Sequence, residues 1–180
     1  DYAIWQRANA DKLLRTKLSY WTRQLEGVET LELPTDHARS AAPDHSGRSV
    51  HTQVGEQLTG ELQQLAQEQG VTLFTLLLAA FKILLYRYSN QRDICVGTPV
   101  ANRTEKAVEP LIGCFVNTVV IRSRMDSEIS VEAFLQQLRD TLLQAYEHQE
   151  VPFEWIVDHT VKERELSRSP LFQVLFTLNN

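Results

Sequence analysis

An apolar run at residues 111–122 constrains the fold of this chain more than any other stretch. It reads Leu-Ile-Gly-Cys-Phe-Val-Asn-Thr-Val-Val-Ile-Arg, and most of its residues are aromatic or β-branched, which favours a strand over a helix. Because nearly every position is apolar, we expect both faces of this strand to be covered by other elements. The run therefore predicts a central strand from Leu111 to Arg122.

Asn117 is the polar exception within this run. An amide that is buried without partners costs about 1–3 kcal/mol, so its side chain needs hydrogen bonds wherever the strand is covered. Two interpretations remain open at this point. The amide either binds a neighbouring loop and fixes the register of the strand, or it points into a channel and orients a polar substrate. Gly113, just upstream, indicates a tight turn or a close approach of backbone or ligand.

The other segments alternate between helical and extended patterns. Apolar periodicity predicts helices at residues 8–25, 60–69, 73–88 and 131–148. The last three of these begin after good N-cap residues, Thr59, Thr72 and Ser130. Further strands are predicted at residues 49–55, 94–100 and 171–178, and a loop at residues 151–170. The fold class that follows is α/β, a layered mixed β-sheet with flanking helices.

Composition excludes several classes of partner. The chain has 180 residues, which suits one domain, and its net charge of −5 without any block of Lys or Arg argues against nucleic acid. No apolar run is long enough to span a bilayer, so we expect no membrane partner. Cys95 and Cys114 lie in apolar, strand-like contexts, and we expect buried thiols in a reducing, cytoplasmic setting.

Common catalytic and metal-binding spacings are missing from the sequence. The five histidines are scattered singly, so no metal site is expected. Neither a glycine-rich phosphate loop nor a GxSxG nucleophile motif occurs. From these residues alone, the chain is an α/β domain without an evident catalytic centre.

Four short motifs occur in a particular order along the chain. They are residues 1–6 (DYAIWQ), residues 112–118 (IGCFVNT) with Arg122, residues 148–154 (HQEVPFE) and residues 164–172 (RELSRSPLF). Together they resemble the core motifs of condensation domains of non-ribosomal peptide synthetases, a family related to chloramphenicol acetyltransferase. Glu150 stands where the family usually has aspartate. The resemblance implies one lobe of a chloramphenicol acetyltransferase-like fold.

The resemblance also implies roles for individual residues. In the family, the strand of the second motif borders a tunnel in which two 4′-phosphopantetheine arms meet. Residues implied to line this substrate channel are Asn117, Gly113 and Phe115. Residues implied in a loop near the channel are His148, Pro152, Phe153 and Glu154. Structural roles are implied for Trp5, Arg122, Arg168 and Pro170.

The family's catalytic motif, His-His-x-x-x-Asp-Gly, is not found in this sequence, which has no two adjacent histidines. We therefore expect residues 1–180 to be a partial condensation domain, mainly its C-terminal lobe, with the N-terminal catalytic lobe and the final segment absent. No catalytic residue is expected in this chain. The parent domain is implied to be an acyltransferase that forms amide bonds, whereas the isolated chain is expected to be inactive.

The implied partners are the missing N-terminal lobe and the donor and acceptor carrier proteins. The substrates would be carried on 4′-phosphopantetheine, and the lobe itself is expected to bind no cofactor. Two alternatives stay open: a non-catalytic module that docks a carrier protein or pairs with another lobe, and a fragment of an epimerisation or heterocyclisation domain. A lobe without its partner would expose an apolar face, which predicts self-association.

Overall fold

The structure is a computed structural model that describes residues 2–37, 46–162 and 168–179. Seven α-helices, one 3₁₀-helix and two strands lie within these residues. In chain order they are α1 (Tyr2–Ala8), α2 (Ala10–Thr16), α3 (Leu18–Gln24), α4 (Glu56–Glu68), α5 (Leu73–Ser89), β1 (Asp93–Val100), η1 (Lys106–Val108), β2 (Asn117–Arg124), α6 (Val131–Glu147) and α7 (Phe153–Thr160).

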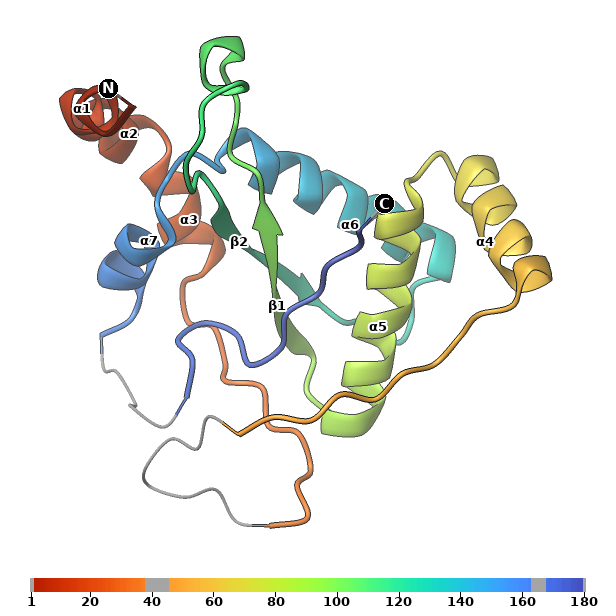
Figure 1. The fold of residues 1–180 in the computed structure, drawn as a ribbon. Helices are drawn as coiled ribbons and strands as arrows, with labels where there is room; N and C mark the ends of the chain where they lie inside the picture. Colours follow the sequence, from red (N-terminus) through yellow and green to blue (C-terminus); the bar gives the residue numbers. More distant parts are fainter. Residues whose placement is uncertain (1, 38–45, 163–167, 180) are drawn as a thin grey trace.

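The sheet is small and joins distant parts of the chain. β1 and β2 pair antiparallel, with Val96 opposite Ile121 and Val100 opposite Asn117. The C-terminal segment runs beside β1 (Figure 1) and forms a parallel bridge between Gly97 and Leu175. The predicted α/β fold with a mixed sheet and flanking helices is therefore confirmed.

Helices on both sides of the strands complete the core. α5 and α6 pack together and contact β1 and β2, while α3 packs on α7, which also contacts β2. In Figure 1, α3 and α7 lie to the left of the strands and α5 to their right. Fully buried side chains from most of these elements meet between them, including Trp21, Leu78, Ile94, Ile121, Leu138 and Ile156.

The prediction of a strand from Leu111 was wrong in its first half, because β2 begins only at Asn117. Residues 111–116 leave the sheet, and Ile112 is fully exposed. Arg103 explains the difference. Its guanidinium donates hydrogen bonds to the backbone carbonyls of Leu111 (3.0 Å) and Gly113 (3.3 Å), so a side chain replaces the strand ladder there. Cys114 lies in this segment and is exposed, contrary to the prediction of a buried thiol.

Two predicted strands are also wrong. Residues 49–55 are exposed and outside any strand, because their alternating side chains find no sheet to cover. Residues 171–178 contribute the single bridge at Leu175 rather than a strand.

The helix predictions held best where the N-cap was correct. Thr72 and Ser130 accept hydrogen bonds from the backbone N–H groups of Thr75 (3.1 Å) and Ala133 (3.2 Å), as predicted. Thr59 does not cap α4, which begins at Glu56, and its hydroxyl instead donates to the carbonyl of Gly55.

The predicted helix at residues 8–25 is divided into three helices, with breaks at Asn9 and Lys17. α7 occupies part of the predicted loop at residues 151–170. Within the described ranges, no single helix is long and apolar enough to cross a membrane; α4 and α5 reach that length and composition only as a pair bent by 103°.

Candidate functional site

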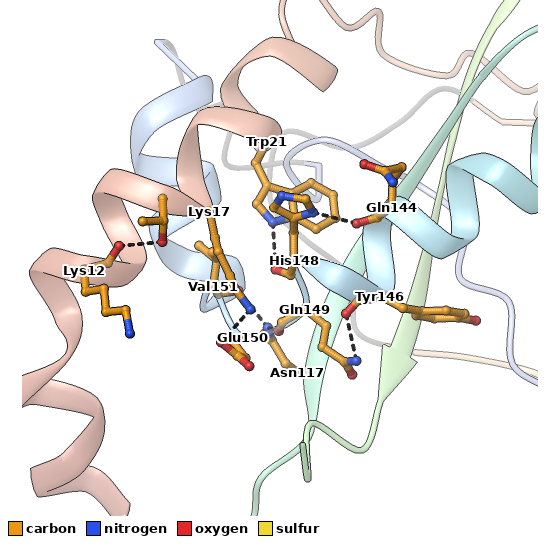
Figure 2. A network of polar contacts seen from close by, with 11 residues as sticks. Lys12, Lys17, Trp21, Asn117, Gln144, Tyr146, His148, Gln149, Glu150 and Val151 are labelled. Carbon is orange, nitrogen blue, oxygen red and sulfur yellow. Dashed lines mark hydrogen bonds and ion pairs between the residues drawn. The ribbon is translucent and has the colours of Figure 1, made fainter. Parts of the chain in front are cut away.

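The loop at residues 148–152, between α6 and α7, is the centre of a polar network that joins three parts of the fold. Figure 2 shows α3 on one side of this loop and the start of β2 on another. Val151, in the middle of the loop, is completely buried. The loop therefore needs partners for its backbone groups, and it finds them in side chains from α3 and β2.

Asn117, the first residue of β2, binds the loop through both ends of its amide. Its Nδ2 donates to the carbonyls of Gln149 and Val151, each at 2.7 Å, and its Oδ1 accepts from the backbone N–H of Phe153 at 3.1 Å. Both amide N–H groups are thus engaged within the protein. Only one lone pair of Oδ1 remains for any further partner while this arrangement holds.

Side chains of α3 and its preceding residue hold the opposite side of the loop. Trp21 Nε1 donates to the carbonyl of His148 at 3.0 Å, and the ring of Tyr20 stacks on the His148 imidazole with centroids 4.2 Å apart. Lys17 Nζ forms an ion pair with Glu150 at 2.8 Å. The loop is consequently clamped between α3 and β2.

Two ring groups of the network, the imidazole of His148 and the phenol of Tyr20, stack on each other at the loop. His148 Nδ1 lies 2.7 Å from the carbonyl of Gln144, so this nitrogen donates its proton there. Burial, reinforced by the charge of Glu147, raises the pKa of Tyr20 to about 12, so its phenol stays protonated at neutral pH. No nucleophile–base pair is evident among these groups.

Phe153 connects the loop to the C-terminal segment. Its ring lies 5.5 Å from that of Phe172, which in turn covers Gly97 of β1 so closely that a Cβ there would lie 2.6 Å from the ring. Pro152 precedes the first turn of α7, and Glu154 lies exposed in that turn. A carboxylate at this position is favourable to the helix dipole.

Gly113 and Phe115 belong to a neighbouring cluster on the β1–β2 connection. The Arg103 guanidinium lies 4.2 Å from the centroid of the Phe115 ring, and the Tyr2 and Phe115 rings meet edge to face with centroids 4.8 Å apart. Trp5 stacks on Tyr2 and is partly exposed. Burial raises the pKa of Tyr2, and the charge of Glu150 adds to this. The cluster adjoins the loop at residues 148–152, because residues 113–116 lead directly into Asn117.

The remaining predicted residues lie elsewhere. Arg122, near the other end of β2, binds both carboxylate oxygens of Asp93. Arg168 forms an ion pair with Glu32, and the carbonyl of Pro170 accepts from the N–H of Phe172 at 2.9 Å. Residues 164–167 of the fourth motif lie outside the described residues. The structure thus brings Asn117 to the 148–154 loop, with Gly113, Phe115 and Trp5 beside it, and separates Arg122 from them.

Sequence reasoning missed Lys82, which is fully buried in α5. Its Nζ donates to the carbonyls of Ile94 (3.0 Å) and Ile121 (2.7 Å), one from each strand. The signal was present, because Lys82 shares the inward stripe of its helix with Leu78 and Leu85 at spacings of four and three residues. Among the described residues, no three His, Cys, Asp or Glu side chains come close enough to hold a metal ion.

The condensation domain family model matches residues 1–180, and this chain belongs to that family. One linear gramicidin synthase subunit, from Brevibacillus parabrevis, is 48% identical over 182 aligned residues, which cover 100% of this chain and 4% of that protein. One plipastatin synthase subunit, from Bacillus subtilis (strain 168), is 42% identical over an alignment that covers 100% of this chain and 7% of that protein. The chain thus spans a small part of these relatives.

Solved structures confirm the fold over most of the chain. A four-domain nonribosomal peptide synthetase in its holo form, bound to AMP and glycine, superposes with a TM-score of 0.85 and 32% identity over 89% of this chain and 12% of that one. The X-domain from teicoplanin biosynthesis superposes with a TM-score of 0.89 and 26% identity over 97% of this chain and 40% of that one, both by itself and in its complex with OxyB.

Proposed function

We propose that residues 1–180 form part of a non-ribosomal peptide synthetase condensation domain, in which a carrier-bound amine attacks a carrier-bound thioester to give an amide. The family match over the whole chain carries this proposal. The proposed partners are donor and acceptor carrier proteins, with substrates on 4′-phosphopantetheine, in the cytoplasm. Within that domain, this chain acts as a scaffold rather than as the source of the catalytic base.

The clamped loop supports a scaffold role near the substrate channel. Asn117 and α3 hold the loop at residues 148–152 through its backbone carbonyls, so the fold itself positions the loop. We propose that Asn117 is a positioning residue that shapes the channel wall through this loop. Gly113, Phe115 and the loop residues His148, Pro152, Phe153 and Glu154 complete that wall.

Exposed apolar side chains on the β1–β2 connection support a covering partner at this place. Ile112 is fully exposed and Val116 is 62% exposed. Two large apolar side chains exposed on one short connection support an interaction surface there. We assign it to the other lobe of the domain, which would bring the adjacent histidines that this sequence does not contain.

A mixing experiment tests this proposal. The segment carrying His-His-x-x-x-Asp-Gly would be taken from the 48% identical linear gramicidin synthase and produced separately. Amide formation between two loaded carrier proteins is then assayed with each piece alone and with both together. Activity only in the mixture is the expected result, and activity of this chain alone contradicts the scaffold role.

A second candidate function is a non-catalytic docking module. The likeness to the X-domain from teicoplanin biosynthesis favours it, because that domain forms a complex with another protein, OxyB. In this alternative the chain binds a partner protein without forming a bond. Tight binding of a carrier protein, together with an inactive lobe mixture, would favour docking over catalysis. An epimerisation or heterocyclisation domain is tested by the same mixture, with racemisation and ring closure as the readouts.

A further inference from the structure

A polar pocket of about 400 Å³ opens between α3, the end of β2 and α6, away from the loop at residues 148–152. Arg122, Ser123 and Arg124 of β2 form one wall, Arg23 and Gln24 of α3 form a second, and Gln137 of α6 forms part of a third. Seven residue steps of about 3.3 Å along β2 place Arg124 roughly 23 Å from Asn117. The pocket is therefore separate from the candidate site.

Arg122 is the fixed element of this pocket. Two of its N–H groups bind the carboxylate of Asp93, and Nη1 donates to the carbonyls of Gln24 (2.9 Å) and Glu26 (2.8 Å). Four of the five guanidinium donors are used in this way. The hydrogen bonds to Asp93 raise the pKa of the Arg122 guanidinium, and the charge of Glu29 adds a smaller effect. Asp93 is thus paired with Arg122.

The two other arginines of the pocket, Arg23 and Arg124, have side-chain N–H groups available to bind a ligand. Arg23 donates Nε to the carbonyl of Ser19 at 3.2 Å, which leaves the four N–H groups of its two Nη atoms available. Among the described residues, the side chain of Arg124 has neither a hydrogen bond nor an ion pair. Both arginines are exposed. Within the described part of the chain, two guanidinium groups without carboxylate partners therefore face one pocket, although the net charge of the whole sequence is −5.

The neutral residues of the pocket add donors of the same kind. Ser123 offers a hydroxyl, and Gln24 and Gln137 offer side-chain amides. Guanidinium forks match the geometry of phosphate oxygens and bind them bidentately. A water molecule takes about 30 Å³ of liquid volume, so a pocket of about 400 Å³ has room for an anion several times larger than one water molecule.

We propose that this pocket binds a small phosphate-bearing anion, of the pyrophosphate or phosphate-ester class, through Arg23 and Arg124. Arg122 contributes its charge and its one remaining donor from a fixed position. The proposal is independent of the function proposed above, because the pocket shares no residue with the clamped loop.

Titration calorimetry of the purified chain with pyrophosphate, and separately with glycerol phosphate, tests this site. The double variant Arg23→Gln/Arg124→Gln is expected to bind at least tenfold more weakly. A matched control, Arg15→Gln/Arg87→Gln, removes the same charge from exposed helical positions outside the pocket and is expected to bind like the unaltered chain.

Three results would overturn the proposal: no binding of either anion at millimolar concentration, equal weakening in the control variant, or no weakening in the pocket variant. Binding of pyrophosphate alone would identify the diphosphate as the ligand, and binding of glycerol phosphate alone would identify the ester. Arg122 stays unaltered in these variants because its ion pair with Asp93 contributes to the fold.

Discussion

Replacement of Asn117 by alanine tests the clamp on the 148–152 loop most sharply. The variant loses three hydrogen bonds, two of 2.7 Å from Nδ2 and one of 3.1 Å to Oδ1. At about 1 kcal/mol net for each neutral hydrogen bond, the expected loss in the free energy of unfolding is about 3 kcal/mol. The carbonyl of Val151 gains no protein partner in exchange, and water entering the half-buried space offsets part of that cost.

Urea unfolding followed by tryptophan fluorescence measures this loss. Trp21 is a suitable reporter, because it is fully buried and donates to the loop at His148. Hydrogen exchange at the amide of Phe153 gives a local readout, and its protection is expected to fall by a larger factor than that of β1 amides. Asn9→Ala is a matched control, because Asn9 makes one exposed hydrogen bond to Trp5 and its loss is expected to cost less than about 1 kcal/mol.

A second variant at the same position separates the two directions of hydrogen bonding. Asn117→Asp keeps an acceptor for the N–H of Phe153 but places a carboxylate oxygen opposite the carbonyls of Gln149 and Val151. We expect it to be at least as destabilising as Asn117→Ala. The reasoning is refuted if either variant unfolds within about 0.5 kcal/mol of the unaltered chain, the range of an ordinary surface substitution.

Three further predictions concern buried contacts outside the loop. Burial lowers the pKa of Lys82 to about 7, so between pH 7 and 10 the unfolded chain binds more protons than the folded chain. The free energy of unfolding should therefore rise with pH over this range, by at most about 1.4 kcal/mol per pH unit. Urea unfolding of Lys82→Met should lack this slope, and a slope equal to that of the unaltered chain would contradict the lowered pKa of Lys82. Gly97→Ala should cost about 1–3 kcal/mol, because its Cβ would overlap the ring of Phe172, and an unchanged urea midpoint would exclude that overlap. Asp93→Asn should lower the free energy of unfolding by about 2–4 kcal/mol, because it weakens the pairing of the largely buried Arg122 guanidinium. A thermal midpoint equal to that of the unaltered chain would show that this ion pair contributes little to stability.

Local signals predicted the helices at the centre of the fold. The caps Thr72 and Ser130 and the apolar stripes behind them were sufficient for α5 and α6, because those signals lie within a few residues of the elements that they define. The break of the N-terminal helix at Lys17 was not predicted, because the apolar stripe continues across it. The ion pair of Lys17 with Glu150, 133 residues later in the chain, was not predicted either, because a contact between residues so far apart leaves no local sequence pattern.

The sequence indicated which residues belong to the candidate site, but not which of them are in contact. The isolated amide in an apolar strand indicated that Asn117 needs partners. The identity of those partners, the carbonyls of Gln149 and Val151, depends on a contact across 32 and 34 residues that no local pattern encodes. The same limit explains residues 111–116, whose β-branched composition favours a strand but whose carbonyls are bound by Arg103.

The most direct test of the proposed function is a chimera in which residues 1–180 replace the 48% identical segment of the linear gramicidin synthase. Amide formation by that condensation domain is then measured with loaded donor and acceptor carrier proteins. We predict that the chimera retains amide formation, and that Asn117→Ala within it lowers kcat more than tenfold while the domain stays folded. A folded chimera that binds both carrier proteins but forms no amide would contradict the assignment of this chain to amide-forming condensation.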